Sequence, residues 1–110
     1  MKRTTITVHA PHEVTANLHV EHVWDEMRRR GAPRIRAVEM DDGSWQALEG
    51  SHRLWVASEQ EHPIVIVPCN PNDRITTDVL GKRRLVRQIV RHMVDMQWER
   101  PMYQLEAEIK

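Results

Sequence analysis

The chain has 110 residues, 40% of them hydrophobic and 29% charged, which is typical of one small globular domain and excludes a disordered chain. Basic and acidic residues both number 16, so no net charge draws the whole protein to nucleic acid or to an anionic membrane. A single cysteine excludes an internal disulfide, and no apolar run approaches the roughly 20 residues that span a bilayer, so we expect a cytoplasmic protein without membrane contact.

The first half of the chain predicts a strand, a helix and a hairpin. Residues 4–8 are mostly β-branched and favour a strand. Apolar side chains recur at helical spacing within residues 17–30, and Gly31 follows them as a helix stop. Residues 35–40 and 45–48 have strand patterns, and the Asp-Gly turn between them predicts a hairpin.

The second half predicts a short helix, a buried strand and a longer helix. Residues 51–60 follow the hairpin as a helix, and the apolar run 64–67 favours a strand covered on both faces. Residues 82–98 have a broad apolar face and predict the strongest helix. We therefore expect an α+β fold of order β-α-β-β-α-β with a C-terminal helical extension. The core would comprise residues 1–70, and residues 71–110 would pack on it or serve dimerisation.

The junction between the hairpin and the next helix carries the most informative motif, Glu49-Gly50-Ser51-His52-Arg53. The first N–H groups of a helix lack internal partners, and the positive end of the helix dipole favours an anion. Gly50 lets the backbone approach a ligand closely, while His52 and Arg53 supply donors for phosphate oxygens. The alternative is an ordinary capped helix, with Ser51 as the cap and Arg53 paired to Glu49.

This motif, together with its flanks, resembles the ParB/sulfiredoxin superfamily. Members often have an acidic residue, a glycine, a variable residue, a histidine, an arginine and an apolar residue, as positions 49–54 have here. The matching text runs from Pro33 to Val67, and the resemblance covers about residues 4–68. It implies a small α/β domain that holds the phosphates of a nucleotide (ATP, ADP or CTP, with magnesium) at the turn Gly50-Ser51-His52-Arg53.

If the resemblance extends to activity, it implies phosphoryl transfer or nucleotide hydrolysis. Glu49 would then be the catalytic base or a magnesium ligand, and Arg53 would stabilise charge on the phosphates. Sulfiredoxins have a reactive cysteine where this chain has Ser51, which argues against sulfinic acid reduction. Partition proteins continue into a helix-turn-helix domain, and we expect the roughly 40 residues after Val67 to be too few for one.

A run of basic residues provides an alternative function, that of a DNA-associated accessory or regulatory protein. The run lies on the helix predicted after Gly81 and comprises Lys82, Arg83, Arg84, Arg87 and Arg91. Such a strip could contact the phosphates of DNA. The apolar face of the same helix instead favours packing on the core or a homodimer through residues 82–98.

Two further groups of side chains have spacings that metal sites also use. His19, His22 and Glu26 follow an i, i+3, i+7 pattern on one helix, and an Asp-Asp pair at residues 41–42 precedes Gly43. We expect the first group to be an ordinary helix surface. The second group has the composition of a tight turn, and we expect it to do no more than form the hairpin.

Overall fold

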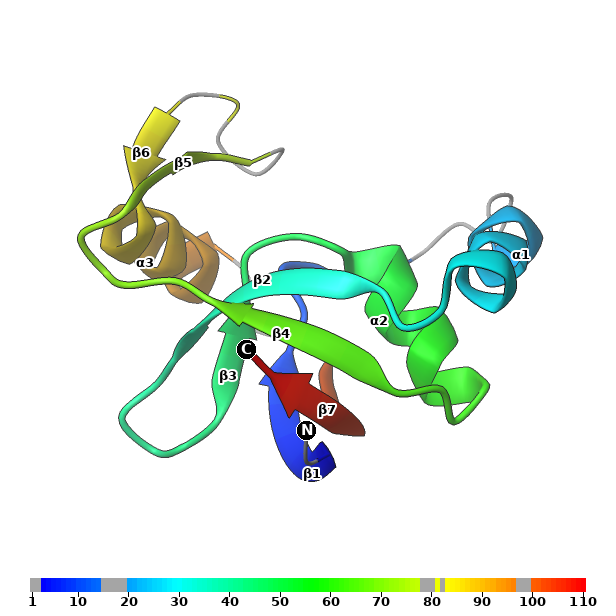
Figure 1. Ribbon diagram of the computed structural model, residues 1–110. Coiled ribbons are helices and arrows are strands. Elements are labelled where there is room, and N and C mark those ends of the chain that lie inside the picture. Colours follow the sequence, from blue (N-terminus) through cyan, green and yellow to red (C-terminus); the bar gives the residue numbers. More distant parts are fainter. Residues whose placement is uncertain (1–2, 15–19, 78–80, 82, 97–99) are drawn as a thin grey trace.

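The computed structural model describes residues 3–14, 20–77, 81, 83–96 and 100–110 of the chain. Its helices are interspersed among its strands along the sequence (Figure 1). In chain order they are β1 (Arg3–His9), α1 (Val20–Arg30), β2 (Arg34–Glu39), β3 (Trp45–Ala47), α2 (Ser51–Glu59), β4 (Ile64–Pro68), β5 (Arg74–Thr76), β6 (Arg83–Leu85), α3 (Val86–Met96) and β7 (Met102–Ile109).

Five of the strands form a closed barrel in the order β1-β3-β2-β4-β7. Strand β7 closes it by pairing antiparallel with β1, from Arg3 opposite Glu108 to His9 opposite Met102, and parallel with β4. Strands β2 and β3 form the predicted antiparallel hairpin, and β2 also runs parallel to β4. The remaining two strands, β5 and β6, form a separate antiparallel ribbon.

The predicted layout of β-α-β-β-α-β with a C-terminal helical extension is wrong. Residues 102–109 form a strand within the barrel, where Leu105 and Ala107 are buried in the core. The helix predicted from residue 82 begins only at Val86, because residues 83–85 pair with β5 instead. The molecule is therefore a small α+β domain in which the last strand completes the sheet that the first strand begins.

Two clusters of buried side chains hold the elements together. The larger one fills the barrel and the space beneath α1 and α2, and its fully buried members include Ile35, Leu54 and Ile64. The smaller cluster joins the helix α3 to the barrel through Val86, Ile89 and Met93, with Val38 and Leu48 among the other residues. The helix face that we expected to serve packing or dimerisation is thus buried within the chain itself.

The helices of the described residues include none that is long and apolar enough to cross a membrane.

Candidate functional site

The turn that joins β3 to α2 has a backbone conformation that only glycine adopts readily. Gly50 is the N-cap of α2 and has φ 83° and ψ 32°. A Cβ atom at this position would lie 2.8 Å from Ile35 Cδ1 and 3.1 Å from Arg53 Nη2. Gly50 therefore meets two requirements at once, a left-handed φ and close contact with its neighbours.

The first turn of α2 presents backbone N–H groups that no side chain caps. The first backbone hydrogen bond of the helix runs from Leu54 N to Gly50 O at 2.9 Å, so the N–H groups of residues 51–53 precede the helical ladder. The N-cap residue makes no side-chain cap bond. The alternative of Ser51 as the cap is wrong, since Gly50 occupies that position and Ser51 Oγ accepts a 3.3 Å bond from His12 N.

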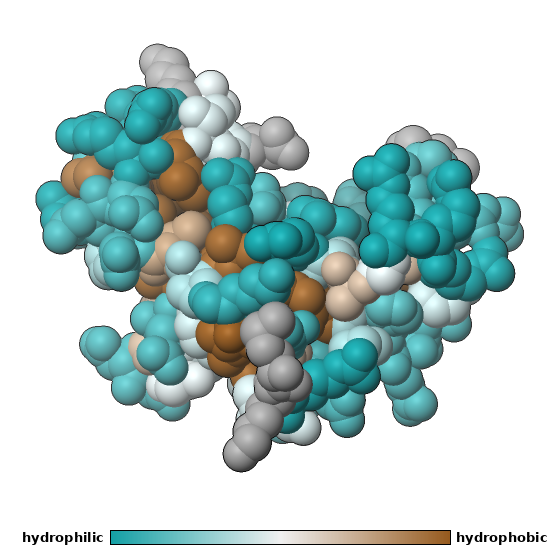
Figure 2. Space-filling view, in the orientation of Figure 1, coloured by the Kyte–Doolittle hydropathy of each residue, from teal (hydrophilic) through white to brown (hydrophobic). Residues whose placement is uncertain are grey.

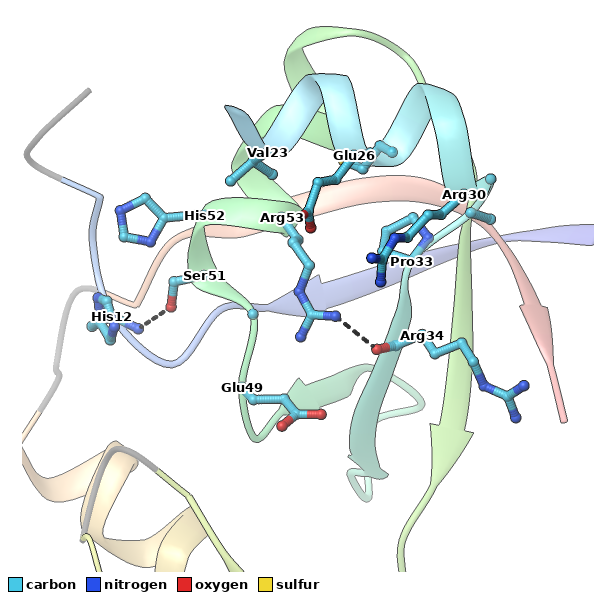
Figure 3. Close-up of a pocket in the computed structure, with 14 residues that line it drawn as sticks. His12, Val23, Glu26, Arg30, Pro33, Arg34, Glu49, Ser51, His52 and Arg53 are labelled. Carbon is cyan, nitrogen blue, oxygen red and sulfur yellow. Dashed lines mark hydrogen bonds between the residues drawn. The ribbon is translucent and has the colours of Figure 1, made fainter. Parts of the chain in front are cut away.

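A cavity of about 710 Å³ opens at this turn, between α1 and α2 (Figure 3). It lies within the size range of small-molecule sites, about 300–1,000 Å³. Three arginines and two glutamates supply its fixed charges, namely Arg30, Arg34, Arg53, Glu26 and Glu49. The predicted residues Gly50, Ser51 and His52 also line it, as do apolar side chains such as Val23 and Met27. The structure therefore brings all five residues of the predicted motif to one cavity.

The guanidinium of Arg53 lies close to the backbone of the turn. Its Nη1 atom donates a 3.1 Å hydrogen bond to the carbonyl oxygen of Arg34, which fixes the side chain across the site (Figure 3). Its Nη2 and Nε atoms lie beside Gly50, at 3.1 Å and 3.4 Å from the position that a Cβ atom of residue 50 would occupy. An anion at the turn would thus meet backbone donors and a fork of charged donors together.

The carboxylate of Glu49 is held by an arginine other than the one we expected. Arg36 donates to both of its oxygens, from Nη2 to Oε1 at 2.8 Å and from Nε to Oε2 at 3.0 Å. These bonds from Arg36 hold the pKa of Glu49 below its ordinary value of 4.5, against the opposing effect of burial. A low pKa makes Glu49 a weak general base, and a metal ion would have to compete with Arg36 for its oxygens.

The same arginine connects the site to the β5–β6 ribbon. Arg36 Nη2 also donates a 3.2 Å bond to the carbonyl oxygen of Thr76 on β5. Sequence reasoning missed Arg36, and it missed Arg30 and Arg34 as lining residues of the cavity. The period-two pattern of β2 could have placed Arg34 and Arg36 on the same side of that strand.

Of the other predicted residues, Glu26 lines the cavity, and the basic residues of the alternative DNA-binding function lie outside it. Arg83 and Arg84 are on β6, and Arg87 and Arg91 are on α3, at the opposite end of the molecule from α1 (Figure 1). Lys82 and His19 fall outside the described residues. Within the described ranges no group of three histidine, cysteine or carboxylate side chains gathers as a metal site, and His22 pairs with Glu26 at 3.4 Å.

We expect Glu49→Gln to lower the free energy of unfolding by about 1–2 kcal/mol near neutral pH, because a half-buried bidentate ion pair is lost. The wild-type advantage is fully present above pH 4.5, the ordinary pKa, and disappears as the pH falls through the lowered pKa of the folded state. Urea unfolding of both proteins over a pH series measures this difference. A difference that is constant with pH would contradict the ion pair as its source, and Glu106→Gln on the exposed side of β7 is the control.

Comparisons of the chain with protein-family models, with curated proteins and with solved structures find no match. The geometry of this cavity and its motif are therefore the basis on which a function is inferred.

Proposed function

We propose that the chain binds a nucleotide, with the phosphates at the turn Gly50–Arg53 at the N-terminus of α2. The observation that carries the proposal is the combination of uncapped first-turn N–H groups and the Arg53 guanidinium in one cavity. Both kinds of donor suit phosphate oxygens, and the helix dipole adds to the attraction. The resemblance of the motif to the ParB/sulfiredoxin superfamily agrees with this proposal and is itself part of it.

The charges of the cavity favour an anionic ligand. Glu49 is neutralised by Arg36, so Glu26 is the remaining acid against the three arginines of the lining. The apolar side chains on α1 offer a surface for the less polar part of a ligand, and a site of this volume takes molecules of nucleotide size. A nucleotide fits this division between a charged end and an apolar end.

Magnesium would enter the site together with the nucleotide. Mg²⁺ is commonly held by substrate phosphates and only one or two carboxylates, with water completing its shell. Two carboxylates line the cavity, and that of Glu26 is free of arginine partners among the described residues. We propose ATP, ADP or CTP as the ligand. If the site also catalyses phosphoryl transfer or nucleotide hydrolysis, an attacking group would have to reach the bound phosphate.

Thermal unfolding with and without ligand tests the proposal. We expect one of ATP, ADP, CTP or GTP with magnesium to raise the melting temperature, since a ligand that binds only the folded state stabilises it by mass action. At about 100 times its Kd the gain is about 2.7 kcal/mol, a shift of roughly 10 °C for a domain of this size. No shift with any of these nucleotides at millimolar concentrations would contradict the proposal.

A further inference from the structure

The β5–β6 ribbon and α3 lie at the opposite end of the molecule from α1 (Figure 1), and they carry a second group of cationic side chains. We call it the basic arm, and it comprises the exposed residues Arg74, Arg83, Arg84, Arg87 and Arg91. From these residues we infer that the basic arm binds the phosphate backbone of double-stranded DNA. This inference goes beyond nucleotide binding and does not depend on it.

The fold creates this surface from two separate pieces of sequence. Strand pairing sets Arg74 opposite Leu85 and Thr76 opposite Arg83, so Arg74 and Arg83 project from one face of the ribbon. The other face carries the exposed Arg84 and also Ile75, which packs against the smaller core cluster. Arg74 thereby joins the cations that follow Gly81, which no local sequence pattern predicts.

Hydrogen bonds fix the ribbon against α3. Val86 N donates to Asp73 O at 2.8 Å, and Arg87 N donates to Pro71 O at 3.0 Å. The Arg87 side chain donates to Asn72 Oδ1 at 2.6 Å, which places it beside the start of β5. The ribbon and the helix that carry these arginines are therefore held together.

The arm keeps a local positive charge although the whole chain is neutral. The described part of residues 70–96 contains these five arginines and only two acidic residues, both aspartates. Of these, Asp73 accepts a bond from Asn70 N, and Asp95 lies 3.9 Å from Arg91 in an exposed pair. Exposed pairs of this kind contribute little, and the Arg91 side chain is 85% exposed. Hydrophilic atoms cover much of this end of the molecule in Figure 2.

The chemistry of the arm favours duplex DNA over other polyanions. Every cation of the described arm is an arginine, whose planar fork matches phosphate oxygens, and a two-stranded ribbon fits the major groove. Single strands are usually held by stacking on aromatic side chains. The described residues of 70–96 include no phenylalanine, tyrosine or tryptophan. The described part of the arm thus offers charged groups for a phosphate backbone and no aromatic platform for unstacked bases.

Fluorescence anisotropy of a labelled mixed-sequence duplex, titrated with the full chain at about 50 mM salt, tests the inference. We expect saturable binding that weakens steeply with salt, and at least a tenfold loss in the double variant Arg83→Glu with Arg91→Glu. The matched control is Arg28→Glu with Arg29→Glu, which makes the same charge change at exposed positions of α1 and should bind nearly as wild type. Arg53→Ala should also bind the duplex normally.

Several results would overturn the inference. These are no saturable binding at low salt, an equal loss in the α1 control, or tighter binding of single-stranded DNA or polyglutamate than of the duplex. If the double variant does not fold, as judged by circular dichroism, the single variants Arg83→Ala and Arg91→Ala replace it. Each variant should then reduce the magnitude of the negative slope of log K against log salt by about 0.9. An unchanged slope would also overturn the inference.

Discussion

Replacing Arg53 by alanine is expected to weaken nucleotide binding by about 10-fold to 100-fold. A hydrogen bond to a charged group contributes about 1.5–3 kcal/mol, and Arg53 is the charged donor that stands beside the backbone of the turn. Isothermal titration with the best of the four nucleotides measures the loss. Arg53→Lys keeps the charge but loses the planar fork, so we expect an intermediate affinity for it.

The control for this prediction is Arg29→Ala. Arg29 is an exposed arginine near the end of α1 and does not line the cavity. Its replacement removes the same charge from the molecule, so it corrects for any general electrostatic effect on nucleotide affinity. Unaltered affinity in Arg53→Ala, or an equal loss in Arg29→Ala, would contradict the proposed phosphate site.

The second prediction is that Gly50→Ala destabilises the protein by about 2–5 kcal/mol. A left-handed φ costs an alanine about 1–2 kcal/mol. The new methyl group would also lie 2.8 Å from the buried Ile35 side chain, and overpacking of this kind adds about 1–3 kcal/mol. The melting temperature should fall by roughly 10–20 °C, and nucleotide affinity should fall with it, since the turn must shift.

Gly43→Ala separates the two contributions. Gly43 has a nearly equal φ of 86°, yet an added Cβ at this position meets nothing within 4 Å. Gly43→Ala should therefore show only the free energy cost of the left-handed backbone. The difference in unfolding free energy between the two variants then measures the cost of the close contact at Gly50. Equal destabilisation in both variants would show that the contact with Ile35 has no energetic effect.

Local patterns in the sequence located the motif and several elements around it. The Asp-Gly signal marks the real turn between β2 and β3, where Asp42 Oδ1 accepts a 2.9 Å bond from Ser44 N. Gly31 follows the last residue of α1, and its N–H donates to Met27 O at 2.8 Å. Gly50 stands at the start of α2 as the motif requires. Each of these features depends on residues close together in the chain.

The parts that sequence reasoning missed depend on distant pairing. Strand β7 has the period-two pattern of a strand from Tyr103 to Ile109, which we did not recognise, and its pairing with β1 at the other end of the chain explains why Leu105 is buried. Residues 83–85 continue the helical pattern of α3, but pairing with β5 overrides that preference. The partner of Glu49 was misassigned for the same reason, because Arg36 reaches it across the hairpin rather than along the motif.

The central claim, that the first turn of α2 binds phosphate, is tested most directly by nuclear magnetic resonance. Uniformly ¹⁵N-labelled protein is titrated with the magnesium complexes of ATP, ADP and CTP, and the amide resonances are followed residue by residue. We predict that the largest saturable shifts fall on the amides of Ser51, His52 and Arg53, whose N–H groups precede the helical ladder. Amides of this turn that stay unshifted at millimolar nucleotide, or shifts confined to the basic arm, would contradict the account.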